Sequence, residues 1–144
     1  MKIPDDTKVQ SIDLTVKDLN AALNFYSDLL GFRVIEKSAN TVALSANGKA
    51  PYIIKLIEDI NAQINYKGAP GLYHLAIRFP DRKELARVFL RLFKNNTKFQ
   101  GFSDHLVSEA IYLSDPEGNG VELYADRPKE EWEWKFGEVL MESL

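Results

Sequence analysis

The chain has 144 residues, a formal net charge of −3 and no cysteine. This composition excludes disulfide bonds, thiolate metal sites and a cysteine nucleophile, and it lacks the basic excess that marks nucleic-acid binding. Hydrophobic residues make up 45% of the sequence, enough for a real core. The opening MKIPDDTKVQ lacks an apolar signal region, and no run approaches the length of a membrane span. We therefore expect a soluble, cytoplasmic protein that binds neither nucleic acid nor membrane.

The first half of the chain predicts one helix among four short strands. Apolar and polar residues alternate in VQSIDLTV, which predicts a half-buried strand. Asp18 is expected to cap the following helix, and Gly31 to end it. Further strands are expected in FRVIEK, TVALSA and YIIKLIE, with the turn NGKAP before the last one. Residues 60–70 carry Gly, Pro and Asn and predict a linker.

The same order restarts after the linker, with a strand in YHLAIRF, a helix in DRKELARVFLRLFKN, a strand in SEAIYLS, a turn in DPEGNG and a strand in VELYA. When the second half of the sequence is aligned with the first so that residue 77 matches residue 14, the first strands of the two halves match and Asp81 matches Asp18. The sequence therefore predicts an α+β fold of two tandem βαβββ modules. They occupy about residues 8–59 and 71–127 of a single domain and are followed by a C-terminal tail at 128–144.

Two such modules side by side are expected to form a curved mixed sheet, with helices on its outer face and a cup on the other. Period-2 alternation then assigns each strand residue to one face. The helix face should hold Ile12, Leu14, Val16, Ile54, Leu56, Leu75, Ile77, Ile111, Leu113, Val121 and Leu123. The cup face should hold Ser11, Asp13, Thr15, Lys55, His74, Arg78, Tyr112, Glu122 and Tyr124. On this assignment His74 looks across the cup at Glu122.

Two segments resemble a known family. DLNAALNFYSDLLGF at 18–32 is similar to the helix that opens each module of the vicinal-oxygen-chelate (glyoxalase/bleomycin-resistance/extradiol dioxygenase) superfamily, and the resemblance runs from about Val9 to Pro128. DHLVSEAIYLSDPEGNGVELYADRP resembles the signature of type I extradiol (catechol 2,3-) dioxygenases. Its positions are filled by His105, Ile111–Tyr112, Asp115–Pro116, Gly118 and Glu122. Ser103, two residues before the histidine, departs from the family's usual choices.

The resemblance implies a divalent metal, Fe(II) or Mn(II), held by two histidines and a glutamate. Carried over by position, His74 and Glu122 would be metal ligands. His105 and Tyr112 would be the catalytic pair that handles the substrate proton.

The metal-ligand set is incomplete in this chain. The repeat assigns the position of the other histidine to Ser11, and a fourth position, a ligand in glyoxalases, holds Lys55. We expect Arg78, Tyr124, Lys55 and Ser11 to contact the substrate. We therefore expect the protein to bind either a divalent metal as its cofactor or no cofactor.

Each of these residues also has a structural interpretation without chemistry. A single histidine on a strand is weak evidence for a ligand, and Lys55 could pair with Glu122 and repel a cation. His105, next to a loop, could cap backbone groups, and Tyr112 could simply pack with its hydroxyl satisfied.

We consider three functions. The first is a small stand-alone ring-cleaving dioxygenase acting on a small aromatic or oxygen-rich molecule. The alternative is a metal-free ligand-sequestering protein of the bleomycin-resistance type. A glyoxalase or epimerase is disfavoured, because two of its four ligand positions hold Ser11 and Lys55. The tail KEEWEWKFGEVLMESL shows a helical alternation of acids with aromatics and should cover a sheet edge or a second subunit, so we expect a homodimer.

Overall fold

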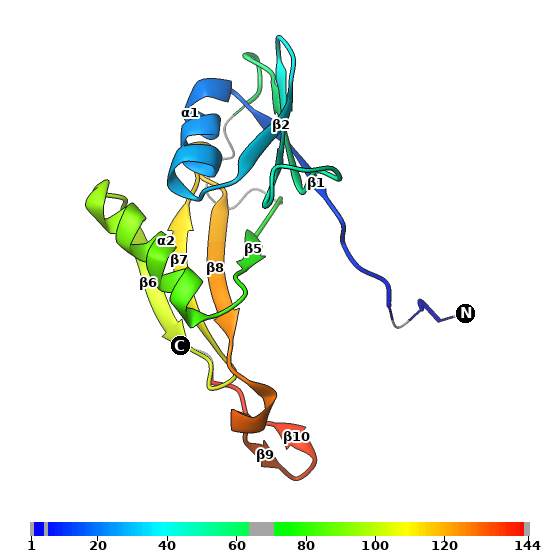
Figure 1. Cartoon of the computed structure of the whole chain (residues 1–144), viewed down its shortest axis with the longest axis vertical. Coiled ribbons are helices and arrows are strands. Elements are labelled where there is room, and N and C mark those ends of the chain that lie inside the picture. The colour runs from blue at the N-terminus through cyan, green and yellow to red at the C-terminus, as the bar shows by residue number, and fades with distance from the viewer. Residues whose placement is uncertain (1, 5, 64–70, 143–144) are drawn as a thin grey trace. The chain divides into compact units, whose positions relative to one another are not determined.

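The computed structural model describes residues 2–4, 6–63 and 71–142. The chain divides into two compact units, residues 1–63 and 64–144, and each contains one four-stranded mixed sheet (Figure 1). The predicted α+β class and the two tandem βαβββ modules are confirmed. The joining of the two sheets into one cup stays a prediction. Most of the predicted linker, residues 64–70, lies outside the described residues.

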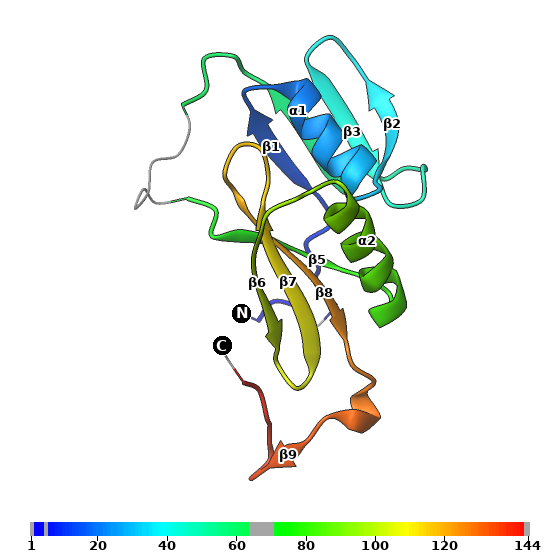
Figure 2. The ribbon, with the colours of Figure 1, turned by 90° about the vertical axis from the view of Figure 1, so that its left-hand side faces the viewer.

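In the first unit the sheet order is β1-β4-β3-β2, with β1 parallel to β4 (Figure 2). Its elements are β1 (Ile12–Val16), α1 (Leu19–Leu23), the π-helical turn η1 (Asn24–Leu29), β2 (Arg33–Lys37), β3 (Thr41–Ser45) and β4 (Ile54–Glu58). Asp18 caps α1 as predicted, because its Oδ1 accepts hydrogen bonds from the backbone N–H groups of Asn20 and Ala21. Gly31 follows the helix with a φ of 95°.

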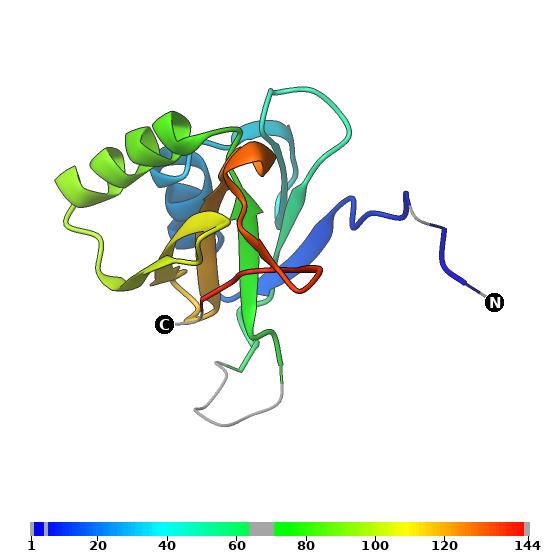
Figure 3. The same ribbon diagram turned by 90° about the horizontal axis from the view of Figure 1, so that it is seen from below.

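In the second unit the order is β5-β8-β7-β6, with β5 parallel to β8. Helix α2, drawn in green, lies on one side of this sheet (Figure 3). Its elements are β5 (His74–Arg78), α2 (Arg82–Lys94), β6 (Phe99–Asp104), β7 (Ser108–Ser114) and β8 (Gly120–Asp126). Asp81 caps α2 by accepting a hydrogen bond from the Glu84 N–H. Among the described residues, no helix is long and apolar enough to cross a membrane.

The predicted helix face forms the core. Seven of its residues are buried: Val16, Ile54, Leu56, Ile111, Leu113, Val121 and Leu123. The other four, which lie on β1 and β5, are half-buried. Tyr73, which opens the expected strand YHLAIRF, lies outside the observed strand. It precedes β5 and is 89% exposed, so it does not continue the apolar face of that strand.

Strand β6 was not predicted as an element. The segment KFQGFSD does not keep a regular alternation, and the register against β7 shifts between Phe99 and Gly101. This bulge lies at the edge of the sheet, next to the candidate site.

The prediction of a helical tail is wrong. After the 3₁₀ turn η2 (Lys129–Glu131), the tail forms a small hairpin of β9 (Trp134–Lys135) and β10 (Glu138–Val139), drawn in orange to red in Figure 1. Phe136 and Gly137 form its two-residue turn with φ angles of 54° and 84°. Two successive positive φ angles fit a type I′ turn, which suits the twist of an antiparallel pair and has no place in a helix.

Candidate functional site

Four of the residues predicted as ligands or catalysts lie together in the second unit. His74 begins β5, Tyr112 lies in β7, Glu122 lies in β8, and His105 follows β6 directly. Tyr112 and Glu122 are paired across the β7–β8 ladder, which places both side chains on the same face of the sheet.

These four side chains form one unbroken chain of hydrogen bonds. His74 Nε2 lies 2.9 Å from Glu122 Oε2, and the Tyr112 hydroxyl donates to Glu122 Oε1 over 2.9 Å. The same hydroxyl lies 2.9 Å from His105 Nε2. Both oxygens of the Glu122 side chain, which is 14% exposed, are thus engaged. The predicted proximity of His74 and Glu122 is confirmed.

His105 has two further partners at its other ring nitrogen. Nδ1 lies 2.6 Å from the backbone carbonyl oxygen of Glu142 and 3.3 Å from the Ser103 hydroxyl. The loop that carries His105 is tightly organised: Leu106 has a φ of 68°, and its N–H donates to Asp104 Oδ1. Arg127 anchors the same loop by donating to the Leu106 carbonyl and to Asp104 Oδ2.

The positions of the hydrogens in this series of hydrogen bonds determine what the four side chains can do chemically. A carbonyl oxygen only accepts, so His105 Nδ1 donates to Glu142, while Tyr112 donates its single hydrogen to Glu122. The remaining contact, between His105 Nε2 and the Tyr112 oxygen, then needs a hydrogen on Nε2. All three contacts are satisfied when His105 carries hydrogens on both nitrogens. The arrangement can therefore hold one extra proton at His105 and pass it from Nε2 toward Tyr112.

The Tyr112 phenol is held in its neutral form. Burial, followed by the hydrogen bond to Glu122 and the negative charge of that carboxylate, raises the pKa of Tyr112 to about 12. At neutral pH Tyr112 therefore acts as a hydrogen-bond donor and relay.

The β7–β8 turn DPEGNG is confirmed as a tight turn. Asp115 Oδ1 accepts from the N–H groups of Glu117 and Asn119, and Gly118 has a φ of 87°. The turn leads directly into Gly120, which is paired with His74 across the β5–β8 ladder. The turn thus sets the position of the strand that carries Glu122.

A cavity of about 470 Å³ opens beside the chain of hydrogen bonds. His74, His105 and Tyr112 line it, together with Tyr73, Gln100, Gly101, Phe102, Ser103, Gly120 and Val121. The bulged edge strand β6 therefore forms one wall of this cavity. A space of this size can hold a small aromatic molecule.

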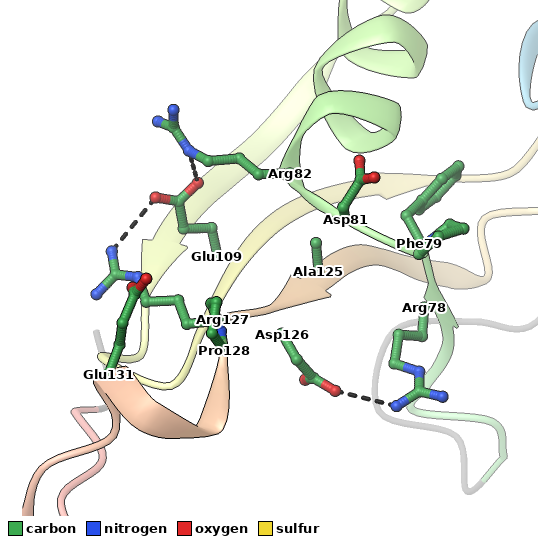
Figure 4. Close-up of a pocket in the computed structure, with 11 residues that line it drawn as sticks. Arg78, Phe79, Asp81, Arg82, Glu109, Ala125, Asp126, Arg127, Pro128 and Glu131 are labelled. Atoms are coloured by element: carbon green, nitrogen blue, oxygen red, sulfur yellow. Dashed lines mark hydrogen bonds and ion pairs between the residues drawn. The ribbon is translucent and has the colours of Figure 1, made fainter.

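Arg78 lies in a different cavity of the same unit, with a volume of about 1020 Å³ (Figure 4). Its Nη1 is 3.1 Å from Asp126 Oδ2, and Arg82 and Arg127 each contact Glu109 on the other wall. This cavity does not include His74, His105 or Tyr112. The expected substrate contact of Arg78 stays a prediction.

The remaining predicted site residues lie on other parts of the fold. Tyr124 is in β8, paired with Arg78 in β5 and Ala110 in β7. Lys55, in β4, and Ser11, just before β1, belong to the first unit. Their expected approach to Glu122 and His74 stays a prediction.

A metal would find two suitable donors here. His74 Nε2 and Glu122 Oε2 are 2.9 Å apart, close to the roughly 3 Å that separates two adjacent ligands each about 2.1 Å from one ion. Within the described part of the chain, no group of three or more His, Asp or Glu side chains could hold a metal ion. The donor set thus fits two of the three positions of a facial triad.

Sequence reasoning missed three groups at this site. The Glu142 carbonyl is a backbone atom, and no side-chain pattern marks it. Ser103 was noted only as a departure from the family's choices. Gly120 belongs to the expected turn DPEGNG, although the repeat of first and last strands places it opposite His74.

The fold and the site together define a βαβββ protein with a histidine–carboxylate pair beside a cavity. The family model of the Glyoxalase/Bleomycin resistance protein/Dioxygenase superfamily matches residues 8–123, and the chain belongs to this superfamily.

Among relatives, the chain is 41% identical over 131 residues to the catechol-2,3-dioxygenase of Bacillus subtilis (strain 168). The match covers 91% of this chain and 46% of that protein, so the chain spans less than half of the length of this relative. Among solved structures, a glyoxalase/dioxygenase from Nostoc punctiforme has a TM-score of 0.72 at 22% identity, covering 89% of this chain and 97% of that one. A lactoylglutathione lyase from Agrobacterium tumefaciens has a TM-score of 0.64 at 23% identity, covering 85% and 96%. These two likenesses concern the fold alone.

Proposed function

We propose that this chain provides the site of a metal-dependent, extradiol-type ring-cleaving dioxygenase that acts on a small catechol-like molecule. The observation that carries the proposal is the connected set His74–Glu122–Tyr112–His105 beside a cavity of about 470 Å³. The 41% identity to a catechol-2,3-dioxygenase supports the same reaction class.

In this proposal His74 and Glu122 hold Fe(II) or Mn(II), and the sequence repeat assigns the third ligand position to Ser11. When bound, such an ion would bring the two oxygens of a catechol together with dioxygen at its open positions. Glu122 orients Tyr112 through Oε1 while Oε2 is directed to the side of His74.

His105 and Tyr112 manage the proton of the substrate hydroxyl. Nε2 of His105 and the Tyr112 hydroxyl lie 2.9 Å apart, and both residues line the cavity. When the His105 ring is neutral with its hydrogen on Nδ1, a catechol hydroxyl that enters the cavity could give its proton to Nε2, as a general base requires. The neighbouring Tyr112 hydroxyl would then turn from Glu122 and donate its hydrogen to the resulting oxygen anion.

A second candidate is a metal-free binding protein of the bleomycin-resistance kind. It is favoured by one observation: His74 and Glu122 already satisfy each other, and Tyr112 satisfies the second Glu122 oxygen. In that case the same cavity would sequester a ligand without reaction.

Metal analysis separates the two candidates. Protein purified without chelator or affinity tag should contain Fe or Mn at close to one ion per chain, with Zn and Ni also measured. His74→Ala and Glu122→Gln should lose the ion. Asp126→Asn, on the same strand as Glu122 but in the other cavity, should keep it.

Ring cleavage is followed as the yellow semialdehyde formed from catechol and substituted catechols. Protein that holds no metal and forms no product, yet binds catechols, would support the second candidate.

A further inference from the structure

The C-terminal tail returns to the candidate site. After the β9–β10 hairpin the chain runs back toward the end of β6 (Figures 1 and 2), where the Glu142 carbonyl lies 2.6 Å from His105 Nδ1. The Glu142 N–H also points to the His105 carbonyl, at 3.4 Å. The backbone of the tail thus contacts both the ring and the backbone carbonyl of His105. Neither contact needs a side chain of the tail.

We propose that the tail fixes the tautomer of His105, so that the neutral ring keeps its hydrogen on Nδ1 and leaves Nε2 free to take up a proton. Glu142 is then a positioning residue that acts through its backbone carbonyl. The proposal deepens the proposed function and rests on it for its catalytic consequence, but the tautomer itself is a property of the folded chain.

The reasoning follows from what each partner of Nδ1 can do. The Glu142 carbonyl accepts only, so the short contact requires a hydrogen on Nδ1. Ser103, 3.3 Å away, has a hydroxyl that can donate as well as accept. With the tail in place, the carbonyl decides the outcome, because an unprotonated Nδ1 would face a carbonyl oxygen that cannot donate, whereas an unprotonated Nε2 faces the Tyr112 hydroxyl, which can turn from Glu122 and donate to it.

Without the tail, the balance reverses. Ser103 can donate to an unprotonated Nδ1, and His105 can then donate from Nε2 to Tyr112, which donates to Glu122. This order satisfies every contact with a neutral ring, so the hydrogen should move to Nε2. The basic nitrogen would then face Ser103 and not Tyr112, and the site would lose its proton acceptor.

The test is the ¹⁵N spectrum of the two histidine rings in ¹⁵N-histidine-labelled protein, at a pH where the rings are neutral. His74→Gln assigns the remaining signals to His105. In the full chain, Nδ1 should be the protonated nitrogen; in a chain ending at Leu140, it should be Nε2. Glu142→Gln keeps the backbone carbonyl and should match the full chain. The backbone amide spectrum verifies that each variant is folded.

A second variant keeps the test decisive if the shortened chain does not fold. In full-length Ser103→Ala, the carbonyl still holds Nδ1, so the tautomer should not change. A tautomer that switches in Ser103→Ala, or that stays the same when the tail is removed, overturns the proposal.

Activity provides the separate readout for the catalytic consequence. The chain ending at Leu140 should keep its metal but cleave catechol at least about tenfold more slowly, since a general base is worth at least that much. If the tautomer switches while the full chain cleaves no catechol, the tail assignment stands and the proposed function fails. Slower cleavage without a tautomer switch overturns the tail assignment alone.

Discussion

Gly120 faces His74 across the β5–β8 ladder at a distance that leaves no room for a side chain. A Cβ at residue 120 would lie 2.6 Å from the Tyr73 carbonyl oxygen and 3.0 Å from the His74 Cβ. The backbone of β8 thus approaches His74 closely at the point where its Nε2 reaches Glu122, two residues further along β8. A glycine is required here because the backbones of β5 and β8 approach closely, and not because of its own φ angle.

Gly120→Ala should therefore destabilise the protein by about 1–3 kcal/mol, because the backbone of a neighbouring strand must move to admit the methyl group. Urea unfolding followed by circular dichroism measures the change. Gly101→Ala is the matched control on β6, where a Cβ would meet nothing within 4 Å, and its effect should be small. Equal effects of the two variants would contradict the steric explanation.

The raised pKa of Tyr112 predicts that the protein loses stability at high pH. Its pKa is raised to about 12 from 10.0, so its phenol stays neutral in the folded protein after an unfolded tyrosine has ionised. The folded state then binds more protons than the unfolded state, and stability must fall as pH rises from about 10 to about 12. Ultraviolet titration of tyrosinate, with Tyr112→Phe to identify its contribution, measures this pKa.

Glu122→Gln should lower the pKa of Tyr112 while leaving it above 10.0, because burial, the largest cause, remains when the charge is removed. A titration curve of Tyr112 that is unchanged in Glu122→Gln would show that the carboxylate has no influence on it.

The parts of the fold that the sequence predicts are those with local signals. Asp18 and Asp81 mark helix starts because their side chains cap nearby N–H groups, and strand alternation assigned the buried residues. The proximity of His74 to Glu122 followed from alternation combined with the repeat.

The failures have physical reasons. β6 was missed because its residue types do not follow its burial: Phe102 is exposed and Ser103 is buried. The tail was taken as helical although WEWKF has the period of a strand, and the turn depends on a positive φ at Phe136, which that residue type does not signal. The contact of the Glu142 carbonyl with His105 leaves no trace in side-chain identity.

The exposed apolar side chains of the tail predict self-association. Trp134, Phe136 and Met141 are 63%, 97% and 62% exposed, and clustered apolar exposure of this kind marks an interaction surface. We expect a homodimer in sedimentation equilibrium at micromolar protein, weakened by Phe136→Ser. Phe93→Ser, at another exposed phenylalanine, on α2, serves as the control. A mass of one chain would contradict the prediction.

The sequence leaves open that Lys55 pairs with Glu122 in place of a metal. If the two form a buried pair, Lys55→Met should cost about 3 kcal/mol or more, because it leaves a carboxylate without its counter-charge. The double variant Lys55→Met/Glu122→Gln should cost much less than the sum of the two single variants. Lys49→Met, at an exposed position of the same unit, is the control. If the two effects simply add, the pair does not exist.

The last prediction concerns the missing histidine. If Ser11, His74 and Glu122 occupy the three vertices of an incomplete triad, Ser11→His should raise the affinity for Mn(II) and Zn(II), since imidazole is a far better ligand than a neutral hydroxyl. Adding Lys55→Ala should raise the affinity further by removing a nearby cation, and His74→Ala in that background should abolish the gain. Gln10→His, one residue away and on the opposite face by strand alternation, should change nothing. Calorimetric titration measures each affinity.

If the double variant binds no more metal than the wild type, the repeat does not bring Ser11 to this site, and metal-free sequestration becomes the better description. Vigorous cleavage of catechol by the wild-type chain would instead mean that Ser11 is no obstacle and that water or another residue completes the ligand set.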